Sequence, residues 1–187
     1  MGSDRQAGEA GFTLIEVLIT TVVIVAIGAM LVPQFSNLMQ SQRARTAARA
    51  VERELQSARL KAVTATKRMR VKLNCPVAGQ LRVVEVTGVA ATDNAANRCD
   101  EVAFPFPGPR DALRSTPSLD APLVRLPQGT TITSVVTTFE FGPRGDAGQV
   151  GATGIAATLA NETTVTVTRA GWSSAIRINP IGKIRID

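Results

Sequence analysis

Apolar residues dominate the chain from position 12 to position 32, where Glu16 is the only charged residue among 21. A helix rises about 1.5 Å per residue, so this run extends roughly 30 Å, the thickness of a bilayer's hydrocarbon core. It therefore predicts a membrane-crossing helix. A carboxylate inside such a span costs about 2.5–3.5 kcal/mol, so we expect Glu16 to have a partner or a task. Pro33 follows the run and, because it removes a backbone donor, is expected to kink or locally melt the helix.

Beyond Pro33, apolar residues recur at spacings of three and four, which predicts an amphipathic continuation of the helix over 34–66. Its apolar face, expected to lie on a sheet, consists of Ala44, Ala48, Val51, Leu55, Ala58 and Ala62. On the opposite face, Arg45, Arg49 and Arg53 follow one another at four-residue intervals; we call these three residues the arginine ladder. Like charges at this spacing repel. The ladder is either a solvated face or a surface that meets acidic neighbours, lipid headgroups or nucleic acid.

From residue 68 the helical period gives way to alternation, with apolar positions 69, 71 and 73 on one face and basic positions 68, 70 and 72 on the other. This pattern predicts a half-buried strand. Further strand-like runs lie at 81–87, 122–126, 130–137, 138–141, 163–168, 175–178 and 183–186. A long helix followed by antiparallel strands predicts an α+β fold, with the helix packed on antiparallel sheet.

Two stretches predict loops. Residues 90–120 are rich in proline, glycine and small polar residues and are expected to form a long loop. Glycines recur every third residue from 142 to 154, which without a proline-rich run predicts a flexible loop and not a collagen segment.

The last twelve residues predict a hairpin. Asn179, Pro180 and Gly182 occupy the favoured positions of a type I turn whose fourth residue is left-handed. The resulting register pairs Asn179 with Lys183, and it buries isoleucines 176, 178, 184 and 186 on one face. On the other face it sets Arg177 opposite Arg185, with Lys183 alongside. Such a cluster either attracts an anion or is neutralised by Asp187, which lies diagonally from Arg177.

Composition adds a formal charge of +6, from 21 Lys and Arg against 15 Asp and Glu, so anionic partners are plausible. Two cysteines, Cys75 and Cys99, fit a disulfide in an oxidising compartment, or else two buried free thiols. The chain has no histidine, no P-loop and no metal-ligand cluster, so we predict no catalytic residue, no metal site and no cofactor.

The segment GFTLIEVLITTVVIVAIGAMLVP, residues 11–33, resembles the prepilin signature of type IV pilins and type II secretion pseudopilins. The resemblance implies that a prepilin peptidase cleaves between Gly11 and Phe12 and that the new amino group of Phe12 is methylated. It also implies that Glu16 pairs with the amino terminus of a neighbouring subunit during assembly.

Three later segments are similar to the GspH/FimT branch of minor pilins and pseudopilins: the basic helix at 48–73, FEFGPRG at 139–145 and IRINPIGKIRI at 176–186. The branch implies a minor subunit with a domain of antiparallel strands packed on the helix. FimT-like members bind DNA through basic residues near the carboxy terminus, and Gly182-Lys183-Ile184-Arg185 resembles their Gly-Arg-x-Arg pattern. Arg177, Lys183 and Arg185 are therefore the DNA-binding candidates, although lysine lacks the bidentate fork of arginine.

These observations predict four segments: a leader at 1–11, a transmembrane and filament-core helix at 12–33, an amphipathic helix at 34–66 and a periplasmic β-rich domain at 67–187. The predicted function is that of a minor pilin in a type IV pilus, with weak binding of double-stranded DNA. The alternative is a type II secretion pseudopilin, and a membrane-anchored periplasmic enzyme is a remote third. The expected partners are prepilin peptidase, other pilins or pseudopilins and the bacterial inner membrane.

Overall fold

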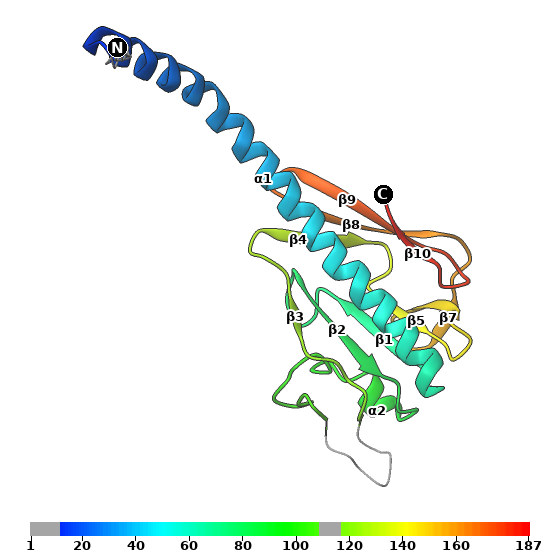
Figure 1. The fold of residues 1–187 in the computed structure, drawn as a ribbon. Helices are drawn as coiled ribbons and strands as arrows, with labels where there is room; N and C mark the ends of the chain where they lie inside the picture. Colours follow the sequence, from blue (N-terminus) through cyan, green and yellow to red (C-terminus); the bar gives the residue numbers. More distant parts are fainter. Residues whose placement is uncertain (1–11, 109–116) are drawn as a thin grey trace, which may run out of the picture. The chain divides into compact units, whose positions relative to one another are not determined.

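The computed structural model describes residues 12–108 and 117–187, so Gly11 and the rest of the predicted leader lie outside the described residues. The chain divides into two compact units, Met1–Met39 and Gln40–Asp187. Helix α1, Leu14–Ala65, contributes residues to both (Figure 1).

The described part of the first unit is helical from Leu14 onward. The helical assignment continues through Pro33, so the predicted local melting does not occur, while the predicted kink remains a prediction. Within 12–108 and 117–187, no helix has both the length and the apolar character required to cross a membrane.

The second unit combines the later part of α1 with two antiparallel sheets (Figure 1). The six-stranded sheet has the order β3-β2-β1-β5-β6-β7 and the four-stranded sheet the order β10-β9-β8-β4. The strands of the first sheet are β1 (Met69–Leu73), β2 (Gln80–Glu85), β3 (Val124–Arg125), β5 (Thr138–Phe141), β6 (Ala147–Val150) and β7 (Ala156–Thr158). Those of the second are β4 (Thr130–Ser134), β8 (Thr163–Arg169), β9 (Trp172–Ile178) and β10 (Ile184–Ile186). The predicted α+β class, a long helix with antiparallel sheets, is confirmed.

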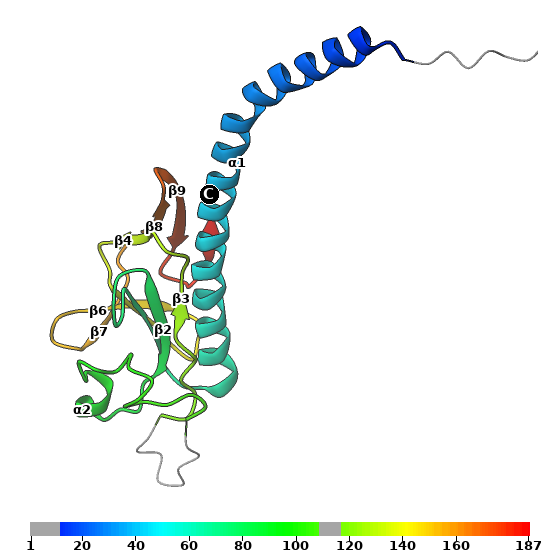
Figure 2. The same cartoon turned by 90° about the vertical axis from the view of Figure 1, so that its left-hand side faces the viewer.

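The core forms where the predicted apolar face of the helix meets the apolar faces of both sheets. The six residues of that face are at most 1% exposed, and five of them share one buried cluster with Phe139 and Phe141 of β5 and Ile176 and Ile178 of β9. Figure 2 shows this part of α1 along one side of the strands and the short helix α2, Ala90–Asp93, on the other side. Alanines on the helix allow the close approach that this packing requires.

Most predicted strands are present with shifted ends. The prediction of a flexible loop over the glycine-rich residues 142–154 is wrong in part. Residues 147–150 and 156–158 form strands β6 and β7, paired with each other. The intrinsic strand propensity of glycine is low, which conceals β6 in the sequence, and β7 contains two alanines, whose strand propensity is also low. The reason for a glycine here is steric: a Cβ on Gly148 would lie 2.8 Å from the carbonyl oxygen of Ala157 on the neighbouring strand.

Candidate functional site

The start of α1 is built by Thr13 and Glu16. The Glu16 backbone N–H donates to the carbonyl oxygen of Thr13 at 3.1 Å and to its hydroxyl oxygen at 3.3 Å, which is the arrangement of a helix N-cap. Glu16 therefore lies in the first turn, where a negative side chain is favoured by the helix dipole. A Thr-x-x-Glu pattern is a recognised cap signal, so this geometry could have been predicted from the sequence.

Apolar side chains on this stretch are exposed. Phe12 and Leu14 are each 83% exposed, and the large apolar residues from 15 to 27 are also exposed. The hydroxyls of Thr20 and Thr21 donate to the carbonyl oxygens of Val17 and Leu18, both at 2.9 Å, so the helix itself satisfies these polar groups. Glu16 is thus a carboxylate within an apolar helical surface, and no ion pair to it is found among the described residues.

The carboxy-terminal hairpin has the predicted register. Arg185 pairs with Arg177, Ile184 with Ile178 and Ile186 with Ile176. The Gly182 N–H donates to the carbonyl oxygen of Asn179 at 2.9 Å, and Gly182 has a φ of +75°, as the proposed turn requires. The register predicted from the turn residues is confirmed.

The hairpin turn is fixed to two other segments of the same unit. Gly182 is buried, and a Cβ there would lie 1.9 Å from the carbonyl oxygen of Gly145, in the turn between β5 and β6. The Arg59 Nε donates to that same carbonyl oxygen at 2.9 Å. The Ala147 N–H donates to the carbonyl oxygen of Pro180, also at 2.9 Å. The basic residues of the hairpin are therefore carried on a rigid element.

Carboxylates neutralise two of the three DNA-binding candidates. Arg177 bonds Asp187 at 2.6 Å and lies 3.5 Å from a Glu162 oxygen, while Arg185 bonds Glu162 at 3.2 Å. For Lys183, no ion pair to its side chain is found within the described parts of the chain. The role of Asp187 follows from the hairpin alone. Glu162 was missed because its proximity depends on the pairing of β8 with β9, which places Thr164 opposite Arg177.

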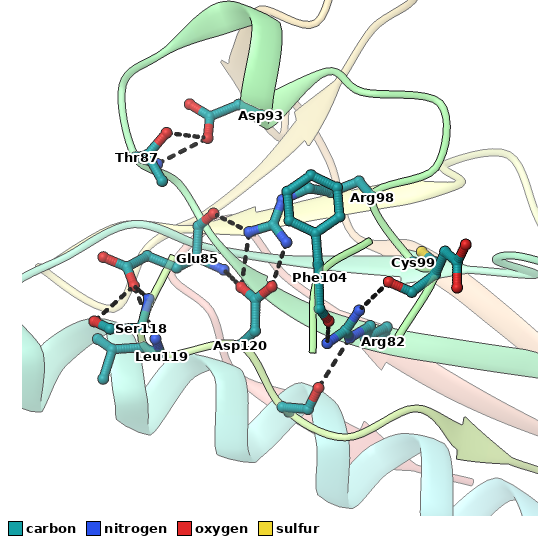
Figure 3. Close-up of polar contacts among 12 residues, drawn as sticks. Arg82, Glu85, Thr87, Asp93, Arg98, Cys99, Phe104, Ser118, Leu119 and Asp120 are labelled. Carbon is teal, nitrogen blue, oxygen red and sulfur yellow. Dashed lines mark hydrogen bonds and ion pairs between the residues drawn. The ribbon is translucent and has the colours of Figure 1, made fainter. Parts of the chain in front are cut away.

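A second set of charges is buried beneath the segment that follows β2 (Figure 3). The Arg98 guanidinium makes two bonds to the Asp120 carboxylate, donates to the carbonyl oxygen of Glu85 at 3.1 Å and lies 4.5 Å from the centre of the Phe104 ring. The side chains of Arg98 and Asp120 are 0% and 1% exposed. Arg82, also 0% exposed, donates to the carbonyl oxygens of Ala121, Asp100 and Phe104.

Glu85 binds the later part of the same segment, at Ser118 and Leu119. Its carboxylate accepts from the backbone N–H groups of Ser118 and Leu119, both at 2.8 Å, and from Lys67. Burial alone would raise the pKa of Glu85, but these hydrogen bonds hold it below its usual value. Cys75 and Cys99 form a disulfide with their Cα atoms 5.8 Å apart. These contacts satisfy the buried groups internally, except for Arg98 Nε, which has no hydrogen-bond partner, so their role is structural.

The described residues include no group of three or more His, Cys, Asp or Glu placed to hold a metal ion. Pockets along the sheets are lined by both polar and apolar groups. One of about 380 Å³ lies between Arg68, Glu140 and Arg144, and another of about 380 Å³ lies beside Lys72 and Asn94.

Comparison with known proteins finds similarity to solved structures. No protein-family model matches the chain, and no curated protein matches it. The type IV minor pilin FimU of Pseudomonas aeruginosa is similar with 15% identity and a TM-score of 0.47, over 82% of this chain and 92% of FimU. The minor pseudopilin EpsH of the Vibrio cholerae type 2 secretion system is similar with 11% identity and a TM-score of 0.45, over 78% and 96% of the two chains.

Proposed function

We propose that this chain is a minor pilin or pseudopilin, a structural subunit of an envelope filament. The observation that carries the proposal is the single carboxylate of Glu16 within an exposed apolar helix, directly after the Gly11-Phe12 junction. An exposed apolar helix requires cover, and a carboxylate within it requires a positive partner once covered. Cleavage after Gly11 would create that partner, because it frees an amino group at Phe12 that a neighbouring subunit can present to Glu16.

The proposed sequence of events begins in the inner membrane, where segment 12–33 anchors the chain and the β-rich domain lies in the periplasm. Prepilin peptidase then removes residues 1–11 and Phe12 is N-methylated. The same apolar segment next enters the filament core beside other pilins or pseudopilins. This proposal covers a type IV pilus and, as the alternative, a type II secretion pseudopilus.

Two measurements test the proposal. Intact mass of the membrane-extracted protein should show loss of residues 1–11 and gain of one methyl group. The Glu16→Ala variant should remain in the membrane fraction but be depleted from sheared filaments, with Glu52→Ala, an acid beyond the apolar segment, as the matched control. A mature chain that still begins at Met1, or a Glu16→Ala variant recovered in filaments like the parent, contradicts the proposal.

DNA binding by Arg177, Lys183 and Arg185 remains a proposal with narrower support. The rigid hairpin displays three cations on one face, but Glu162 and Asp187 offset two of those charges. We therefore expect non-specific affinity for double-stranded DNA at the weak end of about 10⁻⁴–10⁻⁶ M, falling as salt rises. Glu162→Gln should strengthen binding by the full-length protein in detergent, and Lys183→Gln should weaken it. No binding by either the parent or the Glu162→Gln variant at about 50 mM salt would exclude this site.

A further inference from the structure

The face of α1 opposite the core carries a continuous exposed stripe within the second unit. At about 100° per residue, Arg45, Arg53 and Val63 lie within about 40° of Arg49, and Gln56 and Leu60 lie between them. All six side chains are exposed, including Leu60 at 64% and Val63 at 46%. We call these six residues the docking stripe. From Arg45 to Val63 it extends along roughly 27 Å of helix.

The cations of the docking stripe are only partly offset by acids of the same helix, where the charge of Arg53 acts on the neighbouring Glu54 carboxylate. None of Arg45, Arg49 and Arg53 forms an ion pair within the described residues, although eight ion pairs are found in the same residues. The nearest acid in sequence, Glu52, accepts a hydrogen bond from Gln56 at 3.1 Å. The arginine ladder therefore retains part of its internal repulsion, which an acidic partner on another molecule would relieve.

The stripe also exposes apolar surface next to these charges. Leu60 and Val63 continue the arginine ladder toward the end of the helix, so one face offers three cations and two large apolar side chains. Single apolar residues scattered over a solvated helix face are common and need no partner. Exposed apolar side chains in line with unpaired arginines are instead the composition of a protein interface, in which arginine is enriched.

A second copy of this chain does not offer the complementary surface. In the described part of the second unit, Glu85, Asp93, Asp120 and Glu140 are buried, and Glu101, Glu162 and Asp187 already bind arginines of their own chain. The remaining described acids of this unit are Glu52, Glu54, Asp100 and Asp146, and no three of them lie on one element. The net charge of +6 adds long-range repulsion between copies.

We propose that the docking stripe binds an acidic surface on a different subunit of the same filament. The arginine ladder supplies the charge complementarity, and Leu60 and Val63 supply the apolar contact. The inference rests on the proposed function, and it adds that the neighbour on this face is a different protein of opposite charge. In the filament, the docking stripe would then contact that neighbour and not a second copy of this chain.

Charge reversal in the full chain tests the inference in the organism's own cells. Arg45→Glu/Arg49→Glu/Arg53→Glu should lower recovery in sheared filaments roughly tenfold or more, because like charges across an interface cost several kcal/mol. The same triple change to Gln should give an intermediate loss. The matched control is Arg125→Glu/Arg144→Glu/Arg169→Glu, which alters the net charge equally at residues outside α1 and outside the docking stripe and should be recovered like the parent. Formation of the Cys75–Cys99 disulfide in each variant verifies that it folds.

A photo-crosslinking residue in place of Arg49 identifies the neighbour without disturbing the other two arginines. The expected adduct joins this chain to another filament subunit, and Arg substitutions at the acidic residues of the crosslinked surface should restore recovery of the Glu triple variant. An adduct of two copies of this chain, an adduct with DNA, or no adduct in protein that enters filaments overturns the inference. Equal recovery of the Glu triple variant and the parent also overturns it, while the proposed function stands. Absence of the parent itself from filaments would instead contradict the proposed function.

Discussion

The two faces of the six-stranded sheet are both buried, but by different means. On the face toward α1, Met69 and Val71 of β1 and Phe139 of β5 pack against the apolar side of the helix. On the opposite face, Arg70 of β1 and Arg82 of β2 are 6% and 0% exposed beneath an irregular segment. Strands that alternate apolar and basic residues ordinarily predict one solvated face. Here the two arginines of the basic face can be buried because both are hydrogen-bonded and Arg70 is also ion-paired with Glu140.

The two faces of the sheet differ in what the segment packed over each of them must provide. The apolar face requires only matching shape, which a regular helix supplies. The basic face requires an acceptor at each donor. Arg70 bonds Glu140 at 2.7 Å, Asn94 at 3.0 Å and the carbonyl oxygen of Gly154 at 3.0 Å. An irregular segment can supply such carbonyl oxygens because its backbone groups are not used within a helix or a sheet.

Removal of one partner from the buried ion pair should have the largest effect. In Asp120→Ala, the Arg98 guanidinium stays buried with its charge uncompensated, which costs about 3–5 kcal/mol of unfolding free energy. Urea unfolding of the full-length protein in detergent measures the loss.

The control for that variant replaces both partners. Arg98→Met/Asp120→Leu should recover most of the lost free energy, because an apolar pair of similar volume leaves no buried charge. If the double variant is as unstable as Asp120→Ala, the carboxylate acts mainly by accepting from the Glu85 N–H at 2.8 Å and not by compensating Arg98.

Truncation on the apolar face should cost somewhat less. Leu55 is fully buried between α1 and the sheets, and Leu55→Ala should lower the free energy of unfolding by about 3 kcal/mol through lost burial and the cavity it leaves. Leu60→Ala, one turn further and 64% exposed, is the matched control and should change stability little. Equal losses in the two variants would show that the helix packs with a different face.

The contrast between the two faces explains which parts of the fold the sequence predicts. Periodicity located the helix face and most strands, and local turn chemistry at Asn179 and Gly182 determined the hairpin register. Burial of Arg82 and Arg98 could not be predicted, because their acceptors come from Phe104 and Asp120, in a stretch without periodicity. The same limit applies to Glu162 at the hairpin: a charge supplied by a distant strand has no local signal.

Acid should release the irregular segment at its Glu85 attachment. The pKa of Glu85 is held below its usual value in the folded chain, so its stabilisation is present above the unfolded value of about 4.3 and is lost as pH falls through the lower, folded value. Glu85→Gln should cost about 1.5–3 kcal/mol at neutral pH, typical of hydrogen bonds to a charged group. The variant should lose less stability than the parent between pH 5 and pH 3, as measured by urea unfolding. Glu52→Gln, an acid on the helix, should match the parent, and an unchanged pH profile in Glu85→Gln would assign the acid sensitivity to another carboxylate.

The smallest effect is expected at Lys72, where the basic face is left unpaired. Lys72 lies beside Arg70 on β1 and opposite Arg82 on β2, and among the described residues no hydrogen bond or ion pair to its ammonium group is found. Burial, with a further contribution from Arg98 and Arg70, lowers the pKa of Lys72. Its charge therefore opposes folding at neutral pH, and the penalty disappears as pH rises from the lowered folded value to about 10.4. Lys72→Met should raise the free energy of unfolding by a few tenths of a kcal/mol at neutral pH, and this gain should shrink as pH rises toward about 10.4. Lys183→Met, at the exposed hairpin, is the control and should give no such pH-dependent gain. A loss of stability in Lys72→Met would mean that the lysine has a favourable interaction on this face. Lys72 would then no longer be an exception among the cations of the basic face.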